Sequence, residues 1–306
     1  MFNLQNSHEL HHRINTWYQH HARDLPWRRA DCTAWGVMVS EFMLQQTPVN
    51  RVLPVWEEWM HRWPTPASLA AEDSAEAVRA WGRLGYPRRA QRLHGAAVAI
   101  TKHHDGEVPA DYDELLELPG VGAYTAAAIT VFATVIDTNI RRVHARAVMG
   151  KALPHKYLNT AETTLAEELM PQNTAVSCVW NASVMELGAL VCVAKNPRCE
   201  QCPLEDICAW VKAGKPQAEY TPTGQSWHGT DRQLRGAMMA VLRAAHAPVP
   251  RELLTDFSTD ITVPDALKVP VQDLRKLDSS QEQIDRCYSG LLKDKLAKER
   301  KDRVSL

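Results

Sequence analysis

Four cysteines lie within one short stretch of this chain, at Cys192, Cys199, Cys202 and Cys208. Six, two and five residues separate them, so four thiolates share a compact loop that suits a soft metal centre with tetrahedral sulfur ligation. Zinc sites usually come as two short pairs, each with two intervening residues, and only the middle spacing is that short here. The spacing therefore favours an iron–sulfur cluster, and a structural zinc ion is the alternative.

The composition places the chain among soluble globular proteins. Its 306 residues leave room for two domains, and 45% of them are hydrophobic. Seven cysteines, four of them clustered, indicate metal binding in a reducing compartment rather than a disulfide framework. The N-terminal residues form no apolar run like that of a signal peptide, and no later stretch is apolar for long enough to span a membrane. We therefore expect a cytoplasmic protein with no membrane partner.

Helical periodicity dominates the chain up to residue 213, where strand signals are scarce. Apolar residues recur at helical spacing, as in Trp35, Val39 and Met43. This part is predicted to be all-α. Residues 214–230 have the Pro, Gly, Ser and Thr content of a linker, which predicts a second domain over 231–306.

The predicted C-terminal domain combines helices with a hairpin. Amphipathic patterns mark helices at Gln233–Ala245 and Gln281–Lys295, and a shorter helix is predicted at Arg251–Phe257. The last ten residues, 297–306, are predicted to form a short hairpin wing. Three helices and a wing favour a winged-helix-like domain. Such domains bind DNA or protein, and the pattern leaves open whether this one only packs against the rest of the chain.

Charge is segregated along the chain although the net charge is only −1. Segregation of this kind predicts either a positive face that follows a phosphate backbone or a solvated helix surface. The two basic runs contain Arg79, Arg83, Arg88, Arg89, Arg92 and Lys102, and then Arg141, Arg142, Arg146 and Lys151.

A Gly-rich turn over Pro119–Gly122 separates two predicted helices. Gly120 and Gly122 allow close approach to a ligand, and the backbone N–H groups that begin the second helix can bind a phosphate. The segment resembles the helix-hairpin-helix element that grips a DNA backbone. That resemblance also implies a monovalent cation, held by hairpin carbonyls such as those of Leu118 and Val121.

The hairpin, the acid Asp137 and the cysteine loop together resemble the helix-hairpin-helix DNA glycosylases that carry a [4Fe-4S] cluster. The resemblance implies a two-lobed helical fold for residues 1–213. A helical barrel lobe would span about 29–133, and residues 1–28 and 134–213 would form the terminal-helix and iron–sulfur lobe.

Three further segments resemble the A/G-specific adenine DNA glycosylases, the MutY family. They are Leu25–Arg28 (LPWR), Ser40–Thr47 (SEFMLQQT) and Leu84–Tyr86 (LGY). That family removes adenine mispaired with guanine or 8-oxoguanine from double-stranded DNA. Bifunctional relatives place a lysine nucleophile after the hairpin, where this chain has Tyr124. The resemblance therefore implies a monofunctional enzyme that leaves an abasic site, and we expect it to act as a monomer.

Excision of a purine needs two carboxylates in different protonation states. The leaving base must be protonated, and Glu41, on an otherwise apolar helix, is expected to have a raised pKa and to supply that proton. Positive charge grows on the deoxyribose as the bond breaks, so an ionised carboxylate, assigned to Asp137, stabilises the sugar and helps position water. With this chemistry the cluster needs no electron-transfer role. It is expected to shape a DNA-facing loop that includes Lys195 and Arg198.

The resemblance assigns the remaining site residues. The adenine pocket would contain Trp27 and Arg28, the sugar would lie near Tyr124, and Asn139 would lie beside Asp137. The DNA contacts would be Gln46 and Tyr86, which fill the space left by the flipped base, Thr47 near the opposite base, and Leu84, Gly120 and Gly122.

The chain departs from the family pattern in three respects. The connection between the hairpin and Asp137 is a few residues shorter, and Pro87 and Ala182 stand where the family has other residues. The usual C-terminal domain, which reads 8-oxoguanine, is not visible in residues 231–306. Two alternatives to adenine excision therefore stay open, namely a thymine-excising G/T mismatch glycosylase and a DNA-binding homologue that has lost catalysis.

Overall fold

A computed structural model describes residues 7–130, 136–221, 224, 226–258 and 261–306. The described chain is mostly helical, as predicted, and divides into two compact units. Unit 1 comprises Met1–Cys32, Ala110–Leu116 and Val121–Thr223, and unit 2 comprises Thr33–Pro109, Glu117–Gly120 and Gly224–Leu306. None of the described helices is both long and apolar enough to cross a bilayer. The shortened connection before Asp137 falls on residues 131–135, which lie outside the described residues.

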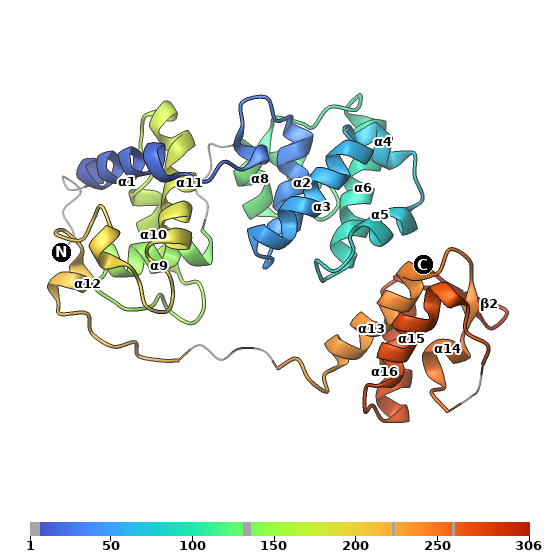
Figure 1. Cartoon of the computed structure of the whole chain (residues 1–306). Helices are drawn as coiled ribbons and strands as arrows, with labels where there is room; N and C mark the ends of the chain where they lie inside the picture. Colours follow the sequence, from blue (N-terminus) through green and yellow to red (C-terminus); the bar gives the residue numbers. More distant parts are fainter. Residues whose placement is uncertain (1–6, 131–135, 222–223, 225, 259–260) are drawn as a thin grey trace. The chain divides into compact units, whose positions relative to one another are not determined.

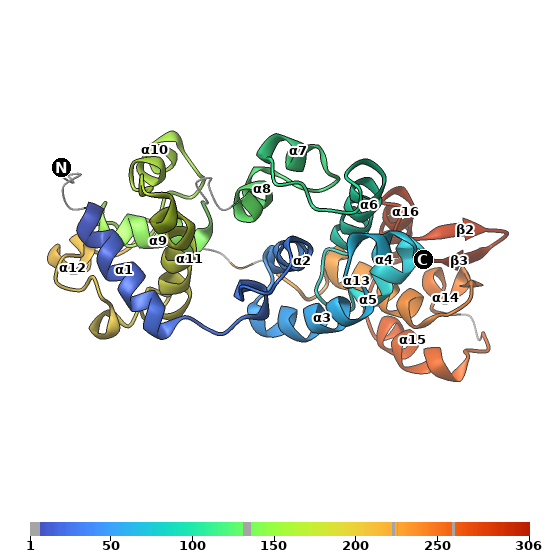
Figure 2. The same cartoon turned by 90° about the horizontal axis from the view of Figure 1, so that it is seen from above.

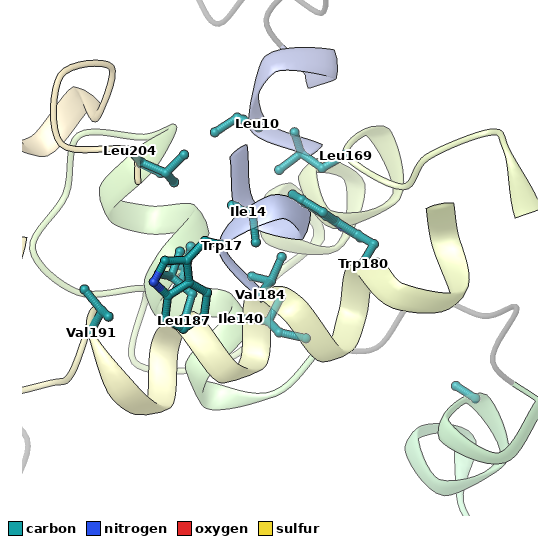
Figure 3. Packing of buried hydrophobic residues seen from close by; sticks show 13 residues of the cluster. Leu10, Ile14, Trp17, Ile140, Leu169, Trp180, Val184, Leu187, Val191 and Leu204 are labelled. Carbon is teal, nitrogen blue, oxygen red and sulfur yellow. The ribbon is translucent and has the colours of Figure 1, made fainter. Parts of the chain in front are cut away.

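Unit 1 is built around a long buried helix, α11 (Thr174–Leu190). Its apolar face packs against α1 (Ser7–His21) and α9 (Thr138–Ala147), and Figure 3 shows Trp17, Ile140 and Leu187 meeting in this core. Helix α9 begins at Asp137, whose side chain accepts a hydrogen bond from the backbone N–H of Ile140. The remaining elements of this unit are η2 (Pro26–Arg28), α7 (Tyr112–Glu117), α8 (Ala123–Thr130), α10 (Thr160–Glu168), η3 (Cys199–Gln201) and α12 (Ala209–Lys212), of which α8, α10 and α12 are labelled in Figure 1.

The first part of unit 2 is a group of helices packed around tryptophans. Trp59 contacts Trp63 and Trp81 edge to face, with ring centroids 4.8 and 5.5 Å apart. Pro48 and Pro87 occupy the N-cap positions of α3 and α6. The helices are α2 (Ala34–Leu44), α3 (Val49–Arg62), α4 (Pro66–Ala70), α5 (Ser74–Ala80) and α6 (Arg88–His103).

The C-terminal part of unit 2 contains the predicted wing. Strands β2 (Lys298–Arg300) and β3 (Arg303–Ser305) form an antiparallel hairpin, drawn as paired arrows in Figure 2. Lys301 and Asp302 join them with φ values of 48° and 57°, as a two-residue hairpin turn requires. Strand β1 (Val249–Pro250), which was not predicted, pairs with β3 and gives the sheet order β1-β3-β2.

Three helices of this part agree with the predicted ones within a few residues, namely α13 (Asp231–Ala244), α14 (Glu252–Thr255) and α16 (Gln281–Lys293). Two further elements, η4 (Asp265–Leu267) and α15 (Lys268–Arg275), were not predicted. Pro270 lies in the first turn of α15, where the missing N–H costs no intrahelical hydrogen bond.

Candidate functional site

The four clustered cysteines line one pocket in unit 1, with an empty volume of about 300 Å³. Cys192 follows α11 and Cys208 precedes α12, so the loop between two helices carries all four thiols. Burial raises the pKa of Cys202 to about 12, so the free thiol holds its proton tightly. Coordination to iron would replace that proton and stabilise the thiolate. Among the described residues, no three His, Cys, Asp or Glu side chains are arranged to hold a single metal ion. The four cysteines instead line one pocket together, and this shared lining fits a cluster larger than a single ion.

Two buried arginines of α9 hold this loop in place. Arg146 donates hydrogen bonds to the carbonyl oxygens of Val193 (2.8 Å) and Ala194 (3.1 Å), and its Nη1 lies 3.4 Å from the Sγ of Cys192. Arg142 donates from Nε to the carbonyl of Cys192 at 2.7 Å. The predicted positive face is therefore wrong for these two residues. They lie inside the unit, where their guanidinium groups donate to the carbonyl oxygens at the start of the cysteine loop.

The same helix holds the predicted catalytic carboxylate. Asn139 donates from Nδ2 to Oδ2 of Asp137 at 3.0 Å, and Arg142 donates to Oδ1 of Asn139 at 2.8 Å. The structure therefore brings Asp137 and Asn139 together and joins them through Arg142 to the cysteine loop. Gly188 of α11 makes this packing possible, because a Cβ there would lie 2.7 Å from the Cβ of Asn139.

The charge state of Asp137 is set by opposing effects. Burial raises its pKa above the ordinary value, and the hydrogen bonds from Ile140 and Asn139 and the nearby Arg142 guanidinium work against that rise. The N-terminus of α9 adds a favourable dipole for a negative charge. The carboxylate is thus held in a partly dry position where its charge acts more strongly than it would in water.

Glu186 of α11 anchors the segment that contains Trp27 and Arg28. Its fully buried carboxylate accepts two hydrogen bonds from the Arg23 guanidinium, at 2.7 and 2.8 Å, and one from the Arg23 backbone N–H. Arg28 donates to the same carboxylate from Nη2 at 3.0 Å, and its Nη1 also lies 3.0 Å from Oε2 of Glu186 in an ion pair. Trp27 is buried beside it, and Tyr124 packs on the core of the same unit.

Replacing Glu186 with glutamine is expected to destabilise the fold by about 3 kcal/mol at pH 7, because Arg23 and Arg28 then lose a buried counter-charge. Burial would raise the pKa of Glu186, but the two arginines more than compensate and lower it to about 2. The contribution is therefore fully present above the unfolded pKa of about 4.5 and is lost as the pH falls towards 2.

Urea unfolding at several pH values measures this difference. The difference in the free energy of unfolding between wild type and Glu186→Gln should narrow below about pH 4.5. The control Glu200→Gln, at an exposed position, should match wild type at every pH. A gap that stays constant down to pH 3 would contradict the ion-pair explanation.

In unit 2, Glu41 is half-buried on α2 among buried neighbours such as Phe42 and Met43. The predicted DNA contacts Gln46 and Tyr86 both have left-handed backbones, with φ values of 54° and 48°. Such values are uncommon for residues with a side chain and mark positions that the surrounding structure must hold in place.

Arg89, buried on α6, holds the backbone on either side of Gln46 and before Tyr86 in place. It joins the end of α2 to the loop before α6, and Thr47 also donates to the carbonyl of Leu84 at 3.3 Å. Thr47 and Leu84 are thus brought together, with Tyr86 under the Arg89 guanidinium at 5.4 Å. Arg89 donates hydrogen bonds to the carbonyls of Phe42 (3.1 Å), Gly85 (3.2 Å) and Gln45 and to the Oγ1 of Thr47 (3.2 Å).

The two hairpin glycines differ in whether a larger residue could replace them. Gly120 has a φ of 83°, and a Cβ there would lie 2.6 Å from the Cβ of Arg92, so only glycine fits. Gly122 is exposed immediately before α8, with open space where a Cβ would be. The predicted phosphate contact at this turn and the cation at the Leu118 and Val121 carbonyls stay predictions.

Sequence reasoning missed the buried charged residues that support the site. Glu186, Arg142, Arg146 and Arg89 were treated as surface charge or passed over. A signal was available for Glu186, an acid inside the apolar stretch SVMELGALV, but its partners lie more than 150 positions away.

Two family models match parts of the chain. Residues 39–176 match the HhH-GPD superfamily of base excision DNA repair proteins, and residues 192–208 match the iron–sulfur binding domain of endonuclease III. The second match confirms the predicted cluster, and the four cysteines bind a [4Fe-4S] cluster rather than zinc.

Individual relatives cover most of the chain. It is 50% identical to the adenine DNA glycosylase of Mycolicibacterium smegmatis, over 78% of this chain and 82% of the relative. It is 48% identical to that of Mycobacterium tuberculosis, over 80% and 82%. The structure of a thermostable thymine-DNA glycosylase, 24% identical, superposes with a TM-score of 0.60 over 68% of this chain and 98% of that one, which confirms the predicted fold. The chain belongs to the adenine DNA glycosylase family, within the HhH-GPD superfamily of base excision DNA repair proteins.

Proposed function

We propose that this protein is a monofunctional DNA glycosylase that hydrolyses the N-glycosidic bond of adenine mispaired with guanine or 8-oxoguanine. The observation that carries the proposal is its 48–50% identity, over most of the chain, to proteins named adenine DNA glycosylase. The Asp137 network supports it, because a partly buried carboxylate fixed by Asn139 suits stabilisation of a sugar cation. The substrate is double-stranded DNA, and the enzyme acts on it as a monomer.

In the proposed reaction, the adenine leaves the base stack and is bound by Trp27 and Arg28. The Arg28 guanidinium, which Glu186 holds in place, can donate a hydrogen bond to an acceptor nitrogen of the purine. Glu41 protonates the base, and the glycosidic bond breaks towards a sugar cation that Asp137 stabilises. Water then adds to the sugar and leaves an abasic site, since Tyr124 offers no amine for a Schiff base.

Cys192, Cys199, Cys202 and Cys208 would hold the [4Fe-4S] cluster, which would cross-link the loop that follows α11. Within the chain itself, Arg142 continues this connection, because it contacts both the carbonyl of Cys192 and Asn139. Lys195 and Arg198 are exposed on the loop and serve as contacts to the DNA backbone.

Alkali cleavage after incubation with defined duplexes tests the proposal. We expect product from A·8-oxoG and A·G duplexes, little from T·G, and intact strands before alkali. Product from T·G alone would show a thymine glycosylase, and product from none of them would show a DNA-binding homologue without catalysis. Either outcome would overturn the assignment.

A further inference from the structure

Unit 2 contains a wide cleft with an empty volume of about 1,960 Å³, to which no role has been assigned so far. One wall comes from the loop before α6 and the other from α13 and α15 of the C-terminal part. Arg79 of α5 ties the walls together, because it donates to the carbonyls of Arg243 and Ala245, the latter at 2.9 Å, at the end of α13. The C-terminal part is therefore docked on α5, next to the loop that contains Tyr86.

The cleft is strongly basic. Five arginines line it, and the one acid among the lining residues, Asp273, forms an ion pair with Lys276 at 3.3 Å. Among the described residues, no acid forms an ion pair with Arg51, Arg83 or Arg243. The lining arginines are Arg51, Arg79, Arg83, Arg232 and Arg243.

Two of these cations come from different walls of the cleft, Arg83 from the loop before α6 and Arg243 from α13. Burial lowers the pKa of Arg243 to about 10, and repulsion from Arg83 contributes to the shift. Holding two guanidinium groups together without a carboxylate costs stability, and a bound anion would relieve that cost. Phosphodiester groups are the anions whose geometry a guanidinium matches best in a nucleic-acid ligand.

Aromatic rings lie at the rim of the same cleft. Trp227, which lines the cleft, is 46% exposed, and Tyr86, between the lining residues Gly85 and Pro87, is 44% exposed. The Arg232 guanidinium lies 5.3 Å from the centroid of each ring, so cation and aromatic groups alternate along the rim. Charged grooves flanked by exposed aromatic rings are the surfaces on which unstacked bases bind.

We propose that this cleft extends the DNA-binding surface beyond Tyr86, in that Arg83 and Arg243 bind backbone phosphates and Trp227 stacks on a base that has left the helix. The C-terminal part would then bind DNA through α13, in addition to packing against the other helices of unit 2. The proposal rests on DNA being the substrate of the proposed function, but it concerns binding alone and needs no catalysis.

The salt dependence of affinity tests the phosphate contacts. In fluorescence anisotropy with full-length protein, Arg83→Gln/Arg243→Gln should bind a fully paired duplex about 10-fold more weakly and reduce the slope of log K against log salt by about 2, because each lost phosphate contact removes about 0.9. The matched control, Lys298→Ala/Arg300→Ala, removes the same charge from the exposed wing and should change the slope by less than half as much. Thermal melts confirm that each variant is folded.

The stacking contact needs a second duplex, with one unpaired base. Trp227→Ala should bind this bulged duplex at least about 5-fold more weakly than wild type and the fully paired duplex equally well. Two results would overturn the proposal. One is an unchanged affinity and slope for the arginine pair, and the other is an equal loss in the wing control, which would mean that basic charge anywhere suffices. Binding of all variants can be normal even if no adenine is released, so failure of this proposal is distinct from failure of the proposed function.

Discussion

Replacing Glu41 with glutamine is expected to slow adenine release by about 100- to 10,000-fold, the usual contribution of a general acid. Glutamine keeps the size of the side chain and can still hydrogen-bond, but it cannot transfer a proton to the leaving purine. Single-turnover kinetics on an A·8-oxoG duplex measure the loss. Binding of the same duplex should stay close to that of wild type, because Glu41 is assigned to the chemical step.

A matched control is available on the next helix. Glu58 is exposed on α3, and Glu58→Gln should release adenine at the wild-type rate. If Glu41→Gln kept full activity, Glu41 would not be the acid, whatever the control did. If its duplex binding fell as much as its rate, the residue would act in substrate binding rather than in proton transfer.

Replacing Asp137 with asparagine is expected to slow adenine release by about 100- to 1,000-fold, the range seen when one electrostatic contact to a charged transition state is removed. The fold should survive, because asparagine is as good an N-cap as aspartate for α9. Burial raises the pKa of Asp137, so the folded state holds its proton more tightly than the unfolded chain does. The ionised carboxylate therefore costs stability above the unfolded pKa, and the cost is complete once the pH exceeds the folded pKa.

Two measurements on Asp137→Asn separate these effects. The melting temperature at pH 7 should equal or exceed that of wild type, whereas single-turnover release should fall. A variant that lost activity and melted well below wild type would point to a structural role for the carboxylate. Equal activity in both proteins would contradict its assignment as the stabilising charge.

Local patterns in the sequence were enough to predict much of the fold. The cysteine spacing predicted the cluster loop, and the helical period predicted helices such as α13 and α16 to within a few residues. The wing predicted at residues 297–306 is formed by β2 and β3. These features depend on neighbours close in the chain, which a single sequence displays directly.

The supporting contacts of the site could not be predicted in this way. The basic run at Arg141–Lys151 was expected to be either a phosphate-facing surface or a solvated one, yet Arg142 and Arg146 are buried against the carbonyls of the cysteine loop. Their partners lie about 50 positions away, and those of Glu186 more than 150. A charged residue that is buried looks the same in sequence as one that is exposed, and only the tertiary fold distinguishes them.

The base that leaves the DNA tests the central claim most directly. An A·8-oxoG duplex incubated with the protein should release free adenine, identified by chromatography and mass, in an amount equal to the abasic sites formed. Release of thymine from a T·G duplex with no adenine from A·8-oxoG or A·G, or strand cleavage without alkali, would contradict the account of a monofunctional adenine glycosylase.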